Sequence, residues 1–170
     1  MYAIWLTGLS GSGKTTIDER LSDYFKNENI KHEILDGDAY RSVLSPNDGY
    51  SEKERDLFRS KVIFIAELLL RNEIACIIPL LSSTRKMRDD ARKKLNNFIE
   101  IYVKCPLDIC SQRDPKGHYK KVKEGKLKNF VGIDLQYEEP VDPEIIIESN
   151  KLTVDEAVEK IVKYLLEKNR

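Results

Sequence analysis

A glycine-rich stretch near the start of the chain has the residue types and spacing of a loop that binds phosphate. The letters GLSGSGKT, residues 8–15, match the pattern G-x-x-x-x-G-K-[ST]. Glycines let such a loop curl until its backbone N–H groups point at phosphate oxygens, and the following helix adds the positive end of its dipole. The sequence therefore predicts a nucleoside triphosphate site. Its expected ligating residues are Gly8, Ser10, Gly11, Ser12, Gly13, Lys14, Thr15 and Thr16.

Within this loop, two side chains have distinct expected roles. Lys14 would reach the outer phosphates, and Thr15 would supply a hydroxyl to Mg²⁺. A triphosphate site does not by itself define an activity. A GTPase should carry N-K-x-D to read the base, and the nearest candidate, residues 150–153, has Thr153 where the acid belongs. Motors and helicases are larger, so a small phosphotransferase is the leading hypothesis.

Two aspartates one glycine apart follow an apolar run in ILDGDAYRSVL, residues 34–44. In a kinase of this class they would leave the carboxyl end of the second strand, where open α/β sheets bind ligands. We expect Asp36 to serve Mg²⁺ and its waters. We expect Asp38 to position the acceptor hydroxyl and to take its proton late in a loose transition state. The alternative is a turn that uses Asp-Gly for its backbone preferences.

Arginines cluster in the segments that leave the same edge of the sheet. A guanidinium group binds phosphate-like oxygens in a bidentate way, so several of these side chains could hold an anionic acceptor. Each could equally be an ordinary surface residue. The candidates are Arg41, Arg55, Arg59, Arg85 and Arg88.

The elements that must position these groups are indicated by alternating patterns. Segments rich in β-formers recur at residues 2–7, 30–35, 74–81, 98–103 and 144–147, separated by helix-like stretches. One helix is expected to follow Lys14, and the last begins at Thr153 with Glu156 three residues on. The prediction is a three-layer α/β sandwich with a mainly parallel sheet, of the P-loop type. Pro79 removes a donor from a central strand, so we expect a bulge there.

Length and composition set further limits. The chain of 170 residues predicts a single domain, residues 1–170. Lysine plus arginine and aspartate plus glutamate both number 29, which argues against binding to nucleic acid or to an anionic membrane. The first residues are expected to form a strand rather than a signal peptide, and no apolar run is long enough to span a bilayer. The unpaired cysteines Cys76, Cys105 and Cys110 favour a reduced, cytoplasmic protein.

The apolar rhythm stops at residues 113–134, where Arg113 and six lysines face three acids. One interpretation is a solvated surface loop. The other is a mobile basic lid that closes over phosphates, because long loops in compact domains are often lids. We assign the lid to residues 113–138.

Together these stretches resemble the adenylylsulfate kinase family, over nearly the whole chain. The matching segments are GLSGSGKTT, LDGD with Arg41, GYS at residues 49–51 with Arg55, and CSQRDPKGHYKKVKEGKLKNFVGIDLQYE at residues 110–138. The resemblance implies transfer of the ATP γ-phosphate to the ribose 3′-hydroxyl of a nucleotide that bears a 5′ mixed anhydride. It also implies Mg²⁺ as cofactor and a homodimer.

By this resemblance, the acceptor base would lie between Tyr50 and Phe130, and Arg55 would meet the mixed anhydride. Ser82 matches a serine often assigned as a phosphoryl carrier, but direct in-line transfer needs no intermediate, so a binding hydroxyl is expected. Arg113 would close on the nucleotides. The expected catalytic set is Lys14, Asp36, Asp38 and Ser82. The expected acceptor-binding set is Asp38, Arg41, Tyr50, Arg55, Phe58, Ser82, Lys120, Lys128, Phe130 and Ile133.

The chain departs from the family pattern at the acceptor side. Ala39 and Phe58 stand where the family usually has asparagines, and Ser83-Thr84 replace Pro-Tyr. Because lost amide donors change which polar groups are satisfied, discrimination between acceptors should shift. Some relatives in the family that this chain resembles phosphorylate cytidine diphosphoramidate for capsule decoration, and the chain looks like a candidate for that branch. On this resemblance we favour cytidine diphosphoramidate over adenylyl sulfate and its role in sulfate assimilation. A nucleotide-binding regulatory module without catalysis, or a generic nucleoside monophosphate kinase, are the other hypotheses.

Overall fold

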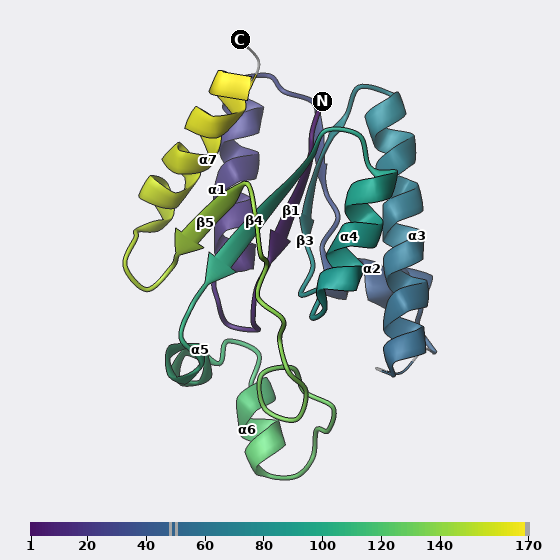
Figure 1. Ribbon diagram of the computed structural model, residues 1–170, viewed down its shortest axis with the longest axis vertical. Coiled ribbons are helices and arrows are strands. Elements are labelled where there is room, and N and C mark those ends of the chain that lie inside the picture. Colours follow the sequence, from purple (N-terminus) through teal and green to yellow (C-terminus); the bar gives the residue numbers. More distant parts are fainter. Residues whose placement is uncertain (48, 50, 169–170) are drawn as a thin grey trace.

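The computed structural model describes residues 1–47, 49 and 51–168, and this part of the chain holds one parallel sheet covered by helices on both faces (Figure 1). The strand order is β2-β3-β1-β4-β5. The strands are β1 (Ala3–Thr7), β2 (His32–Ile34), β3 (Ala75–Pro79), β4 (Phe98–Lys104) and β5 (Ile145–Glu148). The expected three-layer α/β sandwich of the P-loop type is confirmed. All five segments expected to be strands form strands, with ends that differ by a few residues.

Helices α1 (Lys14–Asn27) and α7 (Val154–Lys168) cover one face of the sheet, and α3 (Glu52–Arg71) and α4 (Arg85–Lys94) cover the other (Figure 1). Alternation along β1 explains both layers. Ile4 and Leu6 pack with α1 and α7, whereas Ala3 and Trp5 pack with α3 and α4. Thr153 and Glu156 form the expected reciprocal cap of α7, since each backbone N–H is bound by the other's side chain.

Pro79 does not cause a bulge, so that expectation was wrong. It is the last residue of β3, in register with Leu6 of β1. The N–H groups of Cys76 and Leu80 point to β1, and that of Ala75 points to β2. By this alternation the nitrogen of Pro79 faces the side of β2, which has already ended at Ile34. No ladder hydrogen bond is therefore lost.

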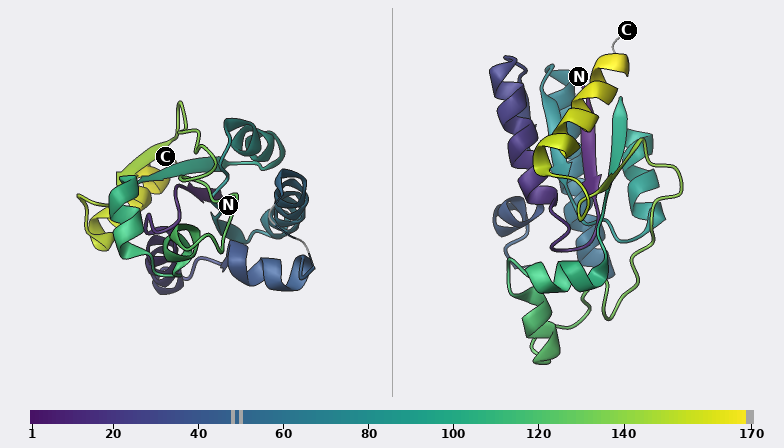
Figure 2. Two further views of the ribbon diagram at one scale, coloured as in Figure 1. Left: turned by 90° about the horizontal axis from the view of Figure 1, so that it is seen from below. Right: turned by 90° about the vertical axis from the view of Figure 1, so that its left-hand side faces the viewer.

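Three short helices lie beyond the carboxyl ends of the strands (Figures 1 and 2). They are α2 (Gly37–Leu44), α5 (Leu107–Arg113) and α6 (His118–Lys123). The predicted lid, residues 113–138, contains α6 and shares a small apolar core with α5 and the phosphate loop, in which Tyr119 and Phe130 pack edge to face with ring centroids 4.9 Å apart. The lid is therefore packed against the rest of the protein and is not only a solvated loop.

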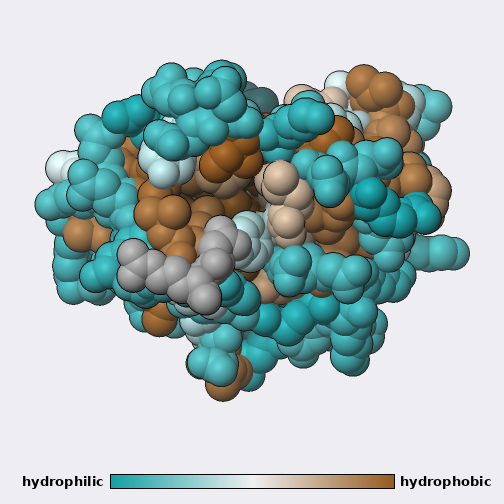
Figure 3. Space-filling view, turned by 90° about the horizontal axis from the view of Figure 1, so that it is seen from above, coloured by the Kyte–Doolittle hydropathy of each residue, from teal (hydrophilic) through white to brown (hydrophobic). Residues whose placement is uncertain are grey.

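The opposite end of the sheet, at the amino ends of the strands, presents hydrophilic residues around apolar patches (Figure 3). No helix among the described residues combines the length and the apolarity needed to cross a membrane.

Candidate active site

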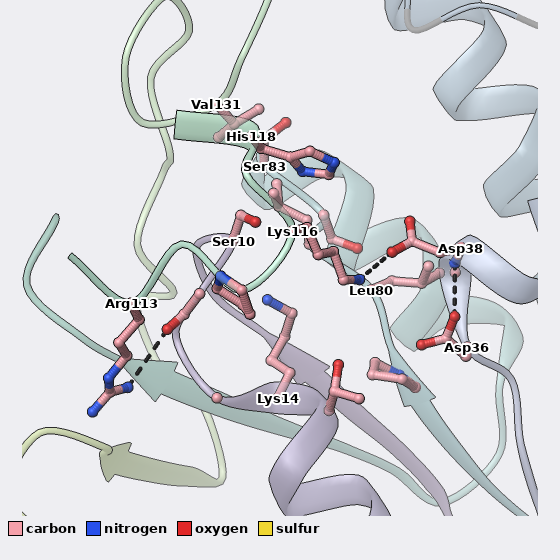
Figure 4. A pocket seen from close by; sticks show the side chains of 18 of the residues that line it. Ser10, Lys14, Asp36, Asp38, Leu80, Ser83, Arg113, Lys116, His118 and Val131 are labelled. Carbon is pink, nitrogen blue, oxygen red and sulfur yellow. Dashed lines mark hydrogen bonds and ion pairs between the residues drawn. The ribbon is translucent and has the colours of Figure 1, made fainter. Parts of the chain in front are cut away.

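A cavity of about 910 Å³ opens at the carboxyl ends of the strands, between the phosphate loop, α2 and α3, and the lid (Figure 4). Most residues predicted for the site line it. They are Ser10, Gly11, Gly13, Lys14, Thr15, Thr16, Asp36, Asp38, Arg41, Arg55, Phe58, Ser82, Arg113, Lys128 and Phe130. We call the part around the phosphate loop and Arg113 the donor end. We call the part around Asp38, Arg41, Arg55, Phe58 and Ser82 the acceptor end.

The phosphate loop joins β1 to α1, and two of its glycines are required by close packing. A side chain at Gly8 would come within 2.4 Å of the carbonyl oxygen of Val103, and one at Gly11 within 2.7 Å of that of Cys110. Both glycines have positive φ, which other residues adopt at a cost. Gly8 and Ser12 lie behind the cavity wall rather than in it, so their contribution is to the shape of the loop.

Lys14 extends from the phosphate loop into the cavity (Figure 4). Its Nζ donates hydrogen bonds of 2.8 Å to the carbonyl oxygens of Gly8 and Leu9. Burial lowers the pKa of Lys14 to about 8, with the nearby Lys116 acting in the same direction. The group is thus a poorly hydrated ammonium, and an anion at the donor end would stabilise its charged form.

Asp36 precedes α2 and caps it. One carboxylate oxygen, Oδ1, accepts hydrogen bonds from the backbone N–H groups of Asp38, at 2.9 Å, and Ala39, at 2.8 Å. The interpretation of Asp-Gly as a backbone device is therefore correct for one oxygen. Asp36 also lines the cavity together with Thr15, so a metal role for the carboxylate is compatible with the cap.

These residues fit a Mg²⁺ site of the kind that relies on substrate phosphates. Among the described residues, no group of three or more histidine, cysteine, aspartate or glutamate side chains could hold a metal by itself. Mg²⁺ typically keeps several waters and takes one or two carboxylates with phosphate oxygens. The Thr15 hydroxyl and the Asp36 carboxylate supply what that arrangement needs from the protein.

Asp38 lies in the first turn of α2 and forms an ion pair with Lys116 of the lid (Figure 4). The pair joins the acceptor end to a segment 78 residues away in the chain. Lys116 lines the cavity and was not among the residues predicted for the site. The sequence could not single out Lys116, because the lid contains several lysines and their spacing does not show which of them faces the cavity.

The arginines fall into two groups. Arg41, Arg55 and Arg59 line the cavity, whereas Arg85 and Arg88 do not. Arg88 is 2 % exposed and donates to the carbonyl oxygens of Ser82 and Glu138, both at 2.6 Å, while its Nε pairs with Glu100 at 2.8 Å. A role for Arg88 in binding an acceptor is therefore not supported by its position: it holds the loop that carries Ser82.

Ser82 lines the acceptor end, and hydrogen bonds hold both its hydroxyl and its carbonyl oxygen. Its Oγ accepts a 3.2 Å hydrogen bond from Nε1 of Trp5, and its φ of 44° is in the left-handed region. The side chain is 8 % exposed. Within the described part of the chain, Ser82 forms no hydrogen bond with a group that could remove its proton, which agrees with a binding role rather than a covalent one.

The lid residues are distributed differently from the prediction. Lys128 and Phe130 line the cavity, but Lys120 points away from it and its neighbour Lys121 lines the wall instead. Ile133 is half-exposed and borders a separate hollow behind the phosphate loop. The structure thus does not bring Lys120 and Ile133 to the acceptor. Tyr50 lies outside the described residues.

Arg113 lies at the donor end (Figure 4). Its Nη2 donates to the carbonyl oxygen of Ser149 at 3.0 Å. Beyond it, the cavity is bordered by Ser149, Leu152 and Val154, which the sequence did not single out. The Ser149 hydroxyl donates to the carbonyl oxygen of Ser12 at 2.6 Å and so ties this segment to the phosphate loop.

The departures at the acceptor side also separate in space. Phe58 and Ser83 line the cavity, whereas Ala39 is exposed on α2 and Thr84 caps α4 by accepting from the N–H of Met87. The Arg41 guanidinium lies over the Phe58 ring, 4.6 Å from its centroid. Phe58 therefore holds Arg41 in place and also narrows the acceptor end of the cavity.

Comparisons with known proteins point to one family. The model of the adenylylsulphate kinase family matches residues 1–148. The chain is 41% identical to a probable adenylyl-sulfate kinase of Pyrococcus abyssi over 95% of this chain and 93% of the relative. It is 42% identical to an adenylyl-sulfate kinase of Rippkaea orientalis, over 93% of this chain and 87% of the relative.

Solved structures agree. The APS kinase CysC of Mycobacterium tuberculosis, in complex with AMPPNP and APS, superposes with a TM-score of 0.93 at 30% sequence identity, over 96% of both chains. Similarity in sequence and in fold therefore extends over the same, nearly complete length.

Proposed function

The chain belongs to the adenylylsulphate kinase family, and on that premise we propose that it transfers the γ-phosphate of ATP to the ribose 3′-hydroxyl of adenylyl sulfate. It is a phosphotransferase with an alcohol group as acceptor, and the family uses ATP with Mg²⁺. The observation that carries the proposal is that Lys14 of the phosphate loop and Asp38 of α2 line one cavity (Figure 4).

At the donor end, backbone N–H groups of the phosphate loop and the Lys14 ammonium would hold the outer phosphates. Burial of Lys14 supports this role, because its charge is poorly solvated until an anion approaches. The apolar surface of Leu152 and Val154, with Arg113 beside it, would receive the adenine. Mg²⁺, held by Thr15 and Asp36, would neutralise charge on the phosphates.

At the acceptor end, Asp38 would hold the 3′-hydroxyl in line with the γ-phosphate and accept its proton as the bond forms. The ion pair with Lys116 supports this role in two ways. The pair fixes the position of the carboxylate at the cavity, and it brings a lid cation to the space between donor and acceptor. Phosphoryl transfer would be direct, with Ser82 as a hydrogen-bonding group.

The chemistry of the acceptor end supports sulfate over phosphoramidate. Arg41, Arg55 and Arg59 all line it, and a guanidinium group only donates hydrogen bonds. A sulfate group offers only acceptor oxygens, whereas the amide nitrogen of a phosphoramidate brings donors of its own. The comparisons also favour adenylyl sulfate, so cytidine diphosphoramidate, the acceptor favoured by the sequence, becomes the second candidate.

Cytidine diphosphoramidate keeps its place as second candidate through Phe58 and Ser83. Both line the cavity at positions where the family pattern differs, and the Ser83 hydroxyl can accept as well as donate. A homodimer and a cytoplasmic location, expected from the resemblance and the cysteines, stay predictions.

The direct test supplies the purified protein with Mg²⁺, ATP and adenylyl sulfate and measures ADP release and the position of the new phosphate. We expect ADP release that depends on adenylyl sulfate, and a phosphate on the 3′-oxygen. No ADP release above background, with or without an acceptor, would favour the regulatory module. Phosphorylation of CMP or AMP on the 5′-phosphate would favour a nucleoside monophosphate kinase.

A further inference from the structure

A carboxylate in the first helix is buried beside the site, and one of its two oxygens lacks a hydrogen-bond partner among the described residues. Asp18 of α1 is 2 % exposed, and its Oδ2 has no hydrogen-bond partner among the described residues. An unpaired carboxylate in such surroundings is costly, and the cost is relieved by a proton or by a cation. The roles proposed above do not use this residue.

The position of Asp18 follows from the way α1 lies along β2. One turn farther along the helix, the Ser22 hydroxyl lies 2.7 Å from Nε2 of His32, at the start of β2. Because the helix and the strand run in opposite directions, Asp18 lies toward the end of β2, where Asp36 follows. Side chains of a helix tilt toward its amino end, which directs the Asp18 carboxylate toward the turn that carries Lys14 and Thr15.

The electrostatics agree with this placement. Burial, and then the neighbouring Asp36 carboxylate, raise the pKa of Asp18 to about 7. Asp18 in turn acts on Lys14 and on Lys116 as a nearby negative charge. Two carboxylates, a hydroxyl and the phosphate loop thus meet at one side of the donor end.

We propose that Asp18 is a second carboxylate of the Mg²⁺ site, which acts together with Asp36 and Thr15 through the water molecules of the ion. Asp18 is not itself part of the cavity wall, whereas Thr15 and Asp36 are, so its link to the ion is by water. Mg²⁺ suits this arrangement because it retains much of its hydration shell. The inference rests on the use of Mg²⁺ with a nucleotide, and not on the identity of the acceptor.

The proposal makes a prediction that a structural role does not make. Neutralising Asp18 should weaken nucleotide binding in the presence of Mg²⁺. Without Mg²⁺ it should leave binding unchanged or strengthen it, because a negative charge near the phosphates is removed. A residue that only supports the fold would change both affinities in the same direction.

The test measures the dissociation constant of ADP by calorimetry, in EDTA and in excess Mg²⁺, without any acceptor. The dissociation constant in EDTA divided by that in excess Mg²⁺ reports the coupling between metal and nucleotide. We expect Asp18→Asn to lower this ratio about tenfold, equivalent to about 1.4 kcal/mol. The matched control is Asp23→Asn on the same helix, whose carboxylate is exposed and pairs with Lys26. That variant should keep the wild-type ratio.

Asp18→Ser provides a second variant, and thermal unfolding checks that both are folded. We expect both to be at least as stable as the wild type without ligand, because a buried unpaired carboxylate has been removed. A ratio within twofold of the wild type in both variants would overturn the proposal. Since no acceptor is present, that result would leave the proposed kinase activity standing.

Discussion

The two ends of the cavity are built from different materials. The donor end is formed largely by backbone, with glycines whose positions leave no room for a side chain and with Lys14 bound to two carbonyl oxygens. The acceptor end is formed by side chains from α2, α3 and the lid, held by ion pairs and a cation–π contact. A backbone site changes little with sequence, whereas a side-chain site can be altered one residue at a time. This explains why the departures from the family pattern that line the cavity, Phe58 and Ser83, lie at the acceptor end and not at the donor end.

The largest effect is expected for Asp38→Asn. The amide cannot accept the proton of the acceptor hydroxyl, so kcat at saturating substrates should fall at least about a hundredfold. The dissociation constant of ADP should stay within about twofold, because the donor end is unchanged. Asp155→Asn, at an exposed site on α7 where the carboxylate pairs with Arg20, is the control. Near-normal turnover by Asp38→Asn would remove the proposed role.

The donor end should respond to pH through Lys14. The pKa of this group lies at about 8, below its usual 10.5, so at higher pH the free enzyme loses the charge that binds phosphate. Nucleotide binding should weaken about tenfold for each unit above that pKa, until the higher pKa of the complex is reached. Fluorescence titration with a labelled ADP measures this. Lys14→Arg stays charged, so its affinity should vary much less over the same range, and equal slopes in both proteins would contradict the assignment.

At the acceptor end, Arg59→Met should raise the KM for the acceptor about fivefold, equivalent to about 1 kcal/mol, and leave the KM for ATP unchanged. Arg59 lines the cavity, pairs with Asp56 at 2.8 Å, and has a buried Nε with no partner among the described residues. Steady-state kinetics with each substrate varied separately tests this. Arg71→Met, at the exposed end of the same helix, should change neither constant. Equal changes in both KM values would mean that the two ends are not independent.

The smallest effect is expected for Ala39→Asn. Ala39 is exposed and does not line the cavity, so restoring the asparagine should change the ratio of kcat/KM between the two acceptors by about twofold or less. Competition between the acceptors in one reaction measures that ratio. A shift of tenfold would show that the rim of the cavity, and not Phe58, determines acceptor choice.

Much of this comparison could be predicted from the sequence, because its signals are local. The phosphate loop is one contiguous pattern, and the strands and helices follow from periodicity, so the fold and the phosphate loop of the donor end could be predicted directly. The packing of the lid was harder to predict. The apolar core that it shares with α5 joins residues as distant in the chain as Cys105 and Phe130, so it leaves no periodic pattern in the sequence. Pairing of Lys116 with Asp38 depends on how the lid folds back. Asp18 carries no signal in the sequence, because its burial depends on how the helix α1 packs along β2.

We propose that an unaltered donor end serves an acceptor end that still selects a sulfate. This is tested by comparing kcat/KM for adenylyl sulfate and for cytidine diphosphoramidate with the same enzyme at the same ATP and Mg²⁺. We expect a preference for adenylyl sulfate of about tenfold or more, equivalent to about 1.4 kcal/mol. Equal values, or a preference for cytidine diphosphoramidate, would contradict it.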